Sequence, residues 1–293
     1  MSDRAGLKDV SSMDAARDEA SPAERNANPS NVADSRLPRS GRFTSNLAIS
    51  IYRVVGVVVF MLAWEATVRA DLVEEQFLSP PSAVWASLRD LAEQGFLWGN
   101  VLATVKATAA GFASGIVVGA ALGFIIGLSR PLSAFCSPFI TMMNSTPRIA
   151  LAPLFVLWFG IGMESRIVLV FSLVVFIILT NTIAGTESVD RDHLTLAKLN
   201  SASRLDVITR VALPSVLPWI LAAMRVAFAY AIAGAVVGEM FLGQEGLGYL
   251  IVAGSGVFNV SQIFAALFVA VAIAFIADRL MALAERRLLR WRA

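Results

Sequence analysis

Six long apolar stretches constrain this chain of 293 residues more than any other feature of its sequence. They lie at about 50–70, 101–128, 133–158, 166–185, 217–242 and 262–284. Each is long enough to cross a bilayer, because about 20 apolar residues of helix span its hydrocarbon core. Only 16% of the residues are charged, against about 25% in average soluble domains. The sequence therefore predicts an all-α polytopic membrane protein with about six transmembrane helices.

The third stretch differs from the others because it contains Pro138, Pro147 and Pro153. Proline lacks a backbone N–H and clashes with the preceding helical turn, so this stretch is expected to be kinked or broken. Such breaks persist at membrane depth where the backbone faces protein or a water-filled path. Polar residues beside the break and on the fourth stretch are therefore predicted to line a path. They are Asn144, Ser145, Thr146, Arg148 and Asn181.

Two charged residues within the stretches have more than one possible role. Arg148 stands beside the break, where a cation either attracts an anion or pairs with a carboxylate. Glu239 lies near the end of the fifth stretch, where it would line a path, gate it, or pair with an arginine of another helix. Because a carboxylate repels anions, gating or pairing is favoured for Glu239 if the solute is anionic.

The second stretch carries a glycine at every fourth position. These glycines are Gly111, Gly115, Gly119, Gly123 and Gly127. Lipid gives helices no hydrophobic drive to associate, so small residues that allow close backbone approach supply the packing. The spacing predicts a structural seam with a neighbouring helix, in preference to a direct role in a path.

Basic residues are distributed unevenly between the segments that flank the stretches. With the N-terminus inside, the inner flanks hold twelve, namely Arg36, Arg39, Arg42, Arg130, Arg191, Lys198, Arg204, Arg210, Arg286, Arg287, Arg290 and Arg292. The outer flanks hold three, namely Arg69, Arg89 and Arg166. Because cytoplasmic loops carry the excess of basic residues, both termini are predicted to be cytoplasmic.

Composition divides the chain into four parts. Residues 1–45 have almost no large apolar side chain and are expected to form a disordered cytoplasmic tail. Residues 46–99 are predicted to hold the first transmembrane helix and an amphipathic segment outside the membrane. Residues 100–284 form the main transmembrane domain, with a cytoplasmic loop at 187–213, and residues 285–293 a basic cytoplasmic tail.

Residue counts exclude several kinds of chemistry. The single Cys136 cannot form an intrachain disulfide, and the single His193 cannot make a multi-histidine metal site. The chain lacks a G-x-x-x-x-G-K-[ST] phosphate cradle, so it is not expected to bind ATP by that route. No catalytic residue, bound metal or bound cofactor is predicted.

The loop at 187–213 is polar and basic although it joins two long apolar stretches. Its sequence predicts a helix at 188–199, a turn at 200–201 and a second amphipathic run at 204–213. One interpretation is a surface helix lying under the lipid headgroups. The other is a docking helix for a cytoplasmic motor.

The spacing in this loop resembles the coupling loop of ABC importer permeases, in which E-A-A, three residues and Gly precede a run that ends in Leu-Pro. Ala197 takes the second Ala position and Lys198 the basic position after it, and Leu213-Pro214 closes the run. Thr195 stands where Glu is usual, and Ser201 where Gly is usual. These departures remove a charged contact and a residue suited to a sharp turn, but the docking role is retained.

Three other segments resemble permeases of the nitrate/sulfonate/taurine importer group. They are TPRIALAPL with LWFGIG at 146–162, Asn181 with the residues up to 190, and Gly238-Glu239-Met240 with GLGYLI at 246–251. With the loop they cover about 100–282. The resemblance implies a type I ABC importer permease fold in the cell inner (plasma) membrane.

The resemblance also implies partners. ATP and Mg would be bound by separate ATP-binding cassette ATPase subunits, a substrate-binding protein would deliver the solute, and the permease would pair with a second copy of itself in the lipid bilayer. A second permease chain is the alternative to that copy, and no nucleic acid partner is expected. The residues implied to contact the ATPase are Asp192, His193, Thr195, Leu196, Ala197, Lys198, Leu199, Ser201 and Arg204.

The solute implied by the resemblance is a small organic or inorganic anion such as a sulfonate, nitrate or taurine. Related chains also serve bicarbonate, aromatic acids and pyrimidine precursors, so the sequence does not identify the substrate. An ion-coupled secondary transporter is the rival class, but it predicts carboxylates deep in the stretches and an internal repeat. A membrane enzyme or scaffold would need a cluster of reactive residues.

Overall fold

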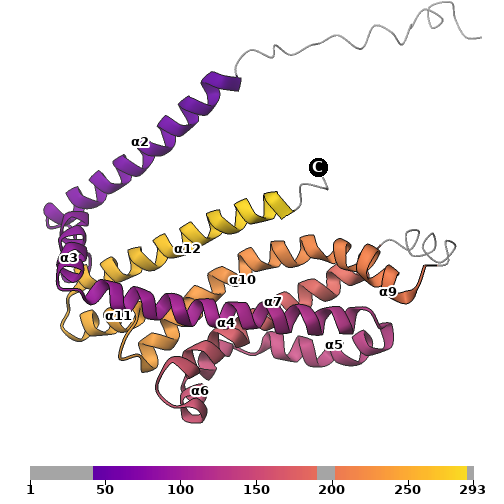
Figure 1. Cartoon of the computed structure of the whole chain (residues 1–293). Helices are drawn as coiled ribbons and strands as arrows, with labels where there is room; N and C mark the ends of the chain where they lie inside the picture. Colours follow the sequence, from indigo (N-terminus) through magenta and orange to yellow (C-terminus); the bar gives the residue numbers. More distant parts are fainter. Residues whose placement is uncertain (1–41, 190–201, 289–293) are drawn as a thin grey trace, which may run out of the picture. The chain divides into compact units, whose positions relative to one another are not determined.

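A computed structural model describes residues 42–189 and 202–288, which are helical with short turns and contain no strand. The elements in Figure 1 are α2 (Arg42–Arg69), α3 (Pro81–Glu93), α4 (Phe96–Gly127), α5 (Arg130–Ser145), η4 (Arg148–Leu151), α6 (Ala152–Phe159), α7 (Met163–Glu187), α9 (Arg204–Val207), η5 (Ile208–Ala212), α10 (Leu213–Leu242), α11 (Leu247–Gly256) and α12 (Val260–Leu288). The chain divides into two units between Val59 and Phe60, within α2. Apart from the part of α2 that precedes Phe60, the features below belong to the second unit.

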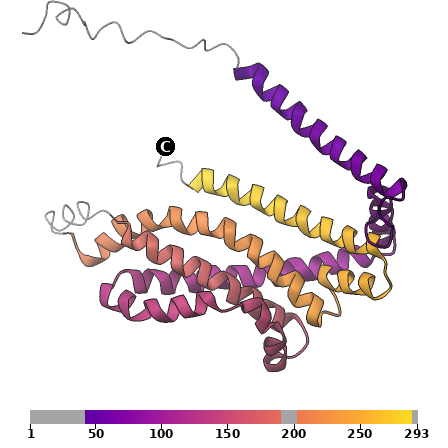
Figure 2. The same ribbon diagram turned by 180° about the vertical axis from the view of Figure 1, so that it is seen from behind.

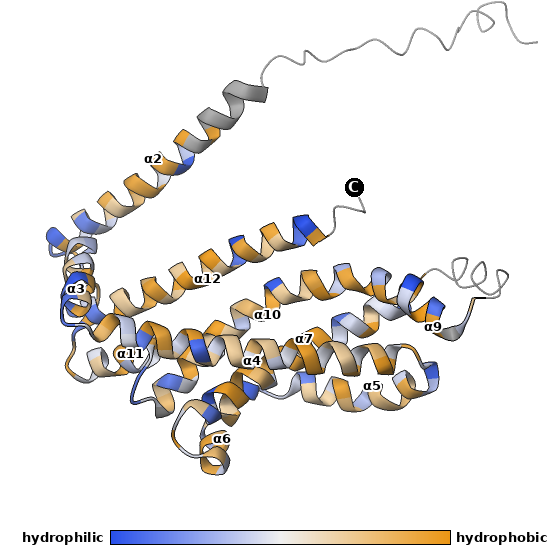
Figure 3. Ribbon diagram, in the orientation of Figure 1, coloured by the Kyte–Doolittle hydropathy of each residue, from blue (hydrophilic) through white to orange (hydrophobic). Residues whose placement is uncertain are grey.

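Five helices in the described ranges are long and apolar enough to cross a membrane. They are Ile51–Arg69, Phe96–Gly127, Met163–Glu187, Leu205–Phe241 and Val260–Leu288. Figure 3 shows hydrophobic residues along most of α4, α7 and α10, with hydrophilic residues gathered at α3 and α9. Five of the six predicted spans are therefore confirmed as continuous helices, whereas the third is divided into α5, η4 and α6.

The predicted break in the third stretch is confirmed at Pro147. α5 ends at Ser145, and Thr146 adopts an extended backbone with φ −73° and ψ 128°. Proline disfavours a helical conformation in the residue before it, which accounts for the end of α5. Pro153 lies in the first turn of α6, where its missing N–H is not needed.

The helix that contains the fifth stretch begins earlier than the sequence predicted. The boundary was expected near 217, but the chain is helical from Arg204 through α9, η5 and α10. The π-helical segment η5 ends at Ala212, two residues before Pro214, which lies in the first turn of α10. A local change of hydrogen-bond pattern accommodates a proline that cannot donate. The amphipathic run at 204–213 is thus continuous with the fifth span.

Helices α4, α7 and α10 pack together as the centre of the second unit, as Figures 1 and 2 show from opposite sides. The contact between α7 and α10 is built from branched side chains on α7 and a column of alanines on α10. Its buried members are Val170, Val174, Ile178, Ala223, Ala227, Ala231 and Ala235. Alanine at every fourth position lets the two backbones approach closely.

The glycines of α4 form the predicted seam, and their neighbour is α7. A Cβ placed at Gly115 would lie 2.7 Å from the Val174 Cβ. One placed at Gly119 would lie 2.5 Å from the Val175 carbonyl oxygen, closer than real Cβ atoms approach. The structural role predicted for these glycines is therefore confirmed.

The substitution Gly119→Ala is expected to destabilise the protein, because the backbone oxygen of Val175 cannot move aside as a flexible side chain could. Overpacking of this kind costs about 1–3 kcal/mol. Gly99 is the matched control, since it lies on the same helix and a Cβ there would meet no atom of another residue within 4 Å. Thermal unfolding of the purified protein in detergent should give a lower midpoint for Gly119→Ala only. Equal midpoints for Gly119→Ala and Gly99→Ala would contradict the close packing of the seam.

The second unit has two polar ends. The α3 end comprises residues 71–95, 160–162, 243–246 and 257–262, and within it Ser261 Oγ donates to Ser79 Oγ at 3.0 Å. The loop end comprises residues 128–133, 187–189 and 202–203, and within it Ser133 Oγ donates to Glu187 Oε1 at 3.1 Å. α4, α7 and α10 connect these ends.

Candidate functional site

The interruption between α5 and α6 brings together four of the predicted path residues. Asn144 and Ser145 are exposed at the end of α5, and Thr146 and Arg148 are half-buried. The hydroxyls of Ser145 and Thr146 donate to carbonyl oxygens one turn earlier in α5, each at 3.0 Å. The break therefore presents hydroxyl and amide groups beside an irregular backbone.

Arg148 is engaged by groups on α5 and α7. Its Nη2 donates to the Met143 carbonyl oxygen at 2.8 Å and to Asn144 Oδ1 at 2.9 Å. Its guanidinium carbon lies 4.4 Å from the centroid of the Phe176 ring. A basic side chain that binds the last carbonyls of a helix stabilises that end. Within the described ranges Arg148 forms no ion pair with a carboxylate, so the predicted pairing is absent there.

Asn181 lies half-buried on α7, where its Nδ2 donates to the Ile177 carbonyl oxygen at 2.8 Å. This bond is internal to α7. Among the described residues no hydrogen bond joins the Asn181 side chain to the four residues at the break. Its place in a path stays a prediction.

Glu239 lies in a buried polar cluster instead of on an exposed wall. The cluster consists of Asn100 and Thr104 on α4, Arg166 on α7 and Glu239 on α10, and its members are at most 7% exposed. Thr104 Oγ1 donates to Glu239 Oε2 at 2.9 Å. The cluster joins three of the long helices at the α3 end.

This cluster caps the start of α11. The backbone N–H groups of Gly246, Leu247 and Gly248 donate to Asn100 Oδ1 at 2.6 Å, Thr104 Oγ1 at 2.9 Å and Glu239 Oε2 at 2.9 Å, respectively. The first N–H groups of a helix have no partner within it, and a negative charge near them is favourable. Side chains of two other helices thus replace a local N-cap, which is absent at Gly246.

Two glycines allow this approach. Gly246 has φ +111°, which disfavours other residues, and a Cβ there would collide with the Glu239 carboxylate. A Cβ at Gly248 would collide with the Val236 carbonyl oxygen and would lie 2.7 Å from the Glu239 Cβ. Close packing against α10 therefore explains why the GLGYLI segment has glycine at positions 246 and 248.

Arg166 links the cluster to two turns at the α3 end. Its Nε donates to the Gly162 carbonyl oxygen at 3.0 Å, and its Nη1 donates to the Glu245 carbonyl oxygen at 3.2 Å. Its Nη2 pairs with Glu245 Oε1 at 3.1 Å. Its Nη1 lies 3.9 Å from Glu239 Oε1, which accepts no hydrogen bond from the described residues. Glu239 is thus paired with an arginine of another helix, one of its three possible roles.

The sequence pointed to Glu239 but not to its partners. Asn100 and Thr104 lie four residues apart on an apolar helix, and Arg166 follows the turn at 160–162. Polar residues at helical spacing in an apolar stretch were the available signal, because such groups need partners in a membrane.

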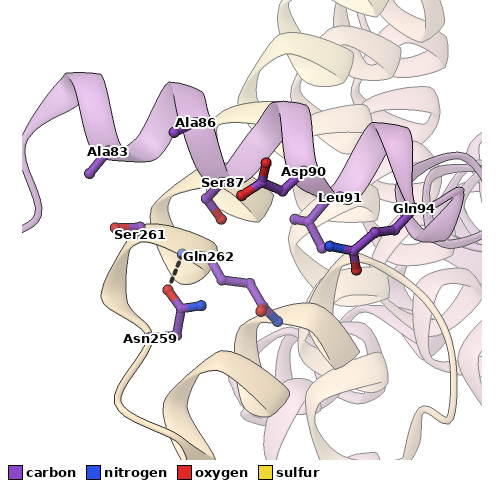
Figure 4. A pocket seen from close by; sticks show the side chains of 9 residues that line it. All are labelled: Ala83, Ala86, Ser87, Asp90, Leu91, Gln94, Asn259, Ser261 and Gln262. Atoms are coloured by element: carbon purple, nitrogen blue, oxygen red, sulfur yellow. Dashed lines mark hydrogen bonds between the residues drawn. The ribbon is translucent and has the colours of Figure 1, made fainter.

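A polar hollow of about 340 Å³ lies between α3 and the start of α12. Figure 4 shows the side chains of α3 facing those of the α11–α12 turn across it. Its polar lining residues are Ser87, Asp90, Gln94, Asn259, Ser261 and Gln262. Asn259 Oδ1 accepts the N–H of Gln262 at 3.1 Å and so caps α12. The hollow therefore presents side chains that can form hydrogen bonds at the surface of the α3 end.

The predicted coupling residues lie outside the described ranges from Asp192 to Ser201, and Arg204 is described only as the first residue of α9. The side chain of Ser203 caps the start of α9. Ser203 Oγ accepts the N–H of Asp206 at 3.1 Å and donates to Asp206 Oδ2 at 2.6 Å. Ser203 is therefore the N-cap of α9, and the Asp206 carboxylate holds its hydroxyl in place.

Residues 115–290 match the family described as "Binding-protein-dependent transport system inner membrane component". The match covers more than half of the chain. The chain belongs to this family. The permease is 37% identical over 240 residues to a riboflavin transport system permease protein of Chloroflexus aurantiacus, covering 82% of this chain and 89% of the relative.

Two other comparisons agree with this assignment. The permease is 28% identical to the taurine transport system permease protein of Escherichia coli, covering 80% of this chain and 87% of the relative. Its fold is similar to a chain of an inward-facing methionine ABC transporter, with a TM-score of 0.59, 18% identity and coverage of 69% of this chain and 98% of the other. The type I importer permease fold predicted from the sequence is confirmed.

Family membership defines the class of protein. Members are permease components of ABC importers, in which a separate chain hydrolyses ATP, so this permease is a transport subunit and not an enzyme. The rival classes, an ion-coupled carrier and a membrane enzyme, are excluded by this assignment.

Proposed function

We propose that the permease forms a translocation path together with a second copy of itself, and that an ATPase drives this path from the cytoplasm. The family match carries the proposal, because it spans the packed centre of the second unit and the loop that joins α7 to α9. α5 supports the pairing, since none of its residues is buried within the chain. A second copy against α5 would cover its apolar side chains and enclose the break at Pro147.

The solute proposed is a small anion such as a sulfonate, nitrate or taurine, delivered by a substrate-binding protein. Names of relatives support this class, since they include a taurine permease and aliphatic sulfonate permeases. Other relatives are named for riboflavin and formylaminopyrimidine, so these two molecules belong in any substrate test. The hollow beside α3 offers a polar surface on which the binding protein would dock.

Both termini and the loop end are proposed to face the cytoplasm. The twelve-to-three distribution of basic residues supports this orientation, and it places the α3 end outside. In a Cys136→Ala background, a cysteine at Gln94 should react with an impermeant maleimide added from outside. A cysteine at Ser203 should react only after the membrane is opened. The reverse pattern would overturn the orientation.

The transport proposal is tested by uptake into proteoliposomes. The permease, reconstituted with its partner ATPase and its partner binding protein, should accumulate one radiolabelled solute from a panel of taurine, methanesulfonate, nitrate, riboflavin and formylaminopyrimidine. Uptake should require ATP and all three proteins, because the permease lacks a nucleotide-binding loop. Uptake by the permease alone, driven by an ion gradient, would contradict the proposal.

A further inference from the structure

A second cavity at the α3 end, the Arg166 cavity, has a volume of about 350 Å³. It lies where the turn before α7 meets the turn between α10 and α11. Its lining residues are Ile161, Gly162, Met163, Arg166, Gln244 and Glu245. This volume is near the lower end for ligand sites, which occupy about 300–1,000 Å³, so it suits a molecule of a few heavy atoms.

Arg166 gives the Arg166 cavity a buried cation. The arginine side chain is only 4% exposed, and it lies against Glu239, which is 0% exposed. A buried guanidinium requires anionic or hydrogen-bonding partners, because leaving it unpaired is strongly unfavourable. Nε and Nη1 are held by backbone carbonyl oxygens, whereas Nη2 is paired with the Glu245 carboxylate. The position beside Nη2 is therefore already occupied by an oxyanion, the Glu245 carboxylate.

Glu245 is suited to being displaced. Its side chain is 54% exposed while its partner is buried, so the carboxylate can return to water without desolvation. Rotation of the side chain alone would free Nη2, because the Glu245 carbonyl oxygen stays on Nη1. A competing oxyanion can replace Glu245, because the incoming anion keeps buried Arg166 paired while the Glu245 carboxylate regains its hydration.

We propose that the Arg166 cavity binds a small organic oxyanion, a sulfonate or a carboxylate, with Arg166 as its anchor and Glu245 as the internal competitor that it displaces. The exchange leaves the net charge around Arg166 unchanged, since one monovalent oxyanion replaces another beside Glu239. The Gln244 amide provides a second donor in the lining, and Ile161 and Met163 provide apolar contact for an alkyl group. This inference rests on the proposed function for the identity of the solute.

Titration calorimetry on the purified full-length permease in detergent tests the site, with methanesulfonate and taurine as probes and neutral methanesulfonamide as the control ligand. Glu245→Gln removes the charged competitor and should tighten methanesulfonate binding at least about fivefold, the upper value for exposed ion pairs, because Arg166 is buried. Glu164→Gln is the matched control, because Glu164 is an exposed carboxylate on the first turn of α7 that does not line the cavity. It should leave the affinity unchanged.

Arg166→Gln should abolish methanesulfonate binding, but this variant also weakens the buried cluster. The decision therefore rests on Glu245→Gln, since misfolding cannot tighten binding. An unchanged affinity in Glu245→Gln, or an equal gain for methanesulfonamide, would overturn the proposal. In proteoliposomes, a lower half-saturating sulfonate concentration for Glu245→Gln would show that the anion bound at Arg166 is the transported solute. If Glu245→Gln instead changes only the affinity for the binding protein, the oxyanion at Arg166 is an acidic side chain of that partner, and the small-molecule proposal is overturned. Loss of the site with normal uptake leaves the transport function intact.

Discussion

Glu239→Ala is expected to remove several kcal/mol of folding stability from the permease. The substitution takes away the fully buried carboxylate beside Arg166, which is also the acceptor for the Gly248 N–H and the Thr104 hydroxyl. Breaking a buried ion pair by removing one partner costs about 3–5 kcal/mol, because the remaining charge stays buried. The expected observation is a lower thermal midpoint in detergent and less monodisperse protein on size-exclusion chromatography.

Two variants separate charge from shape in this experiment. Glu239→Gln keeps the size of the side chain and one acceptor oxygen, so it should cap α11 in part and fall between wild type and Glu239→Ala. Glu164→Gln removes an exposed carboxylate from the first turn of α7 and should change the midpoint little, since exposed charges contribute about 1 kcal/mol or less. If Glu239→Ala unfolds at the wild-type temperature, the buried cluster does not hold α11 in place.

The spans were predictable because a membrane makes their signal local. An apolar run of sufficient length indicates a helix whatever its neighbours are. The break was predictable for the same reason, because Pro147 and the residue before it set their own backbone preferences. The glycine spacing predicted a close helix contact, but not that α7 is the neighbour, since any helix could in principle meet such a seam.

The buried cluster shows what the sequence could not provide. The sequence identifies Arg166 only as a basic residue of an outer flank, and nothing near it in sequence indicates that it is buried beside Glu239. Helix α4 begins at Phe96, five residues before the predicted apolar stretch, and so includes the polar Asn100. Asn100 can be buried there because its Oδ1 accepts the Gly246 N–H, a partner that is distant in sequence. Contacts between residues distant in sequence depend on how the helices pack, and the local sequence pattern does not determine that packing.

Ala197→Asp is expected to abolish transport while the permease still reaches the membrane. The reasoning comes from the sequence, since Ala197 lies outside the described ranges. If the coupling loop docks on an ATPase, the apolar face of Leu196, Ala197 and Leu199 occupies a cleft of that subunit, where small buried anchors carry most of the binding energy. A carboxylate left unpaired in that cleft should cost several kcal/mol. Co-purification of the ATPase and ATP-dependent uptake should both be lost.

Lys198→Ala is the control for this experiment. A lysine at the rim of such an interface contributes about 1 kcal/mol or less, so its loss should reduce uptake only slightly. The two neighbouring substitutions are therefore expected to differ greatly in their effect on uptake, although each makes the net charge of the loop more negative by one. A permease carrying Ala197→Asp that retains its ATPase and transports normally would mean that 187–213 is not the coupling element. The loop would then be a surface helix under the lipid headgroups, the other interpretation that its sequence allows.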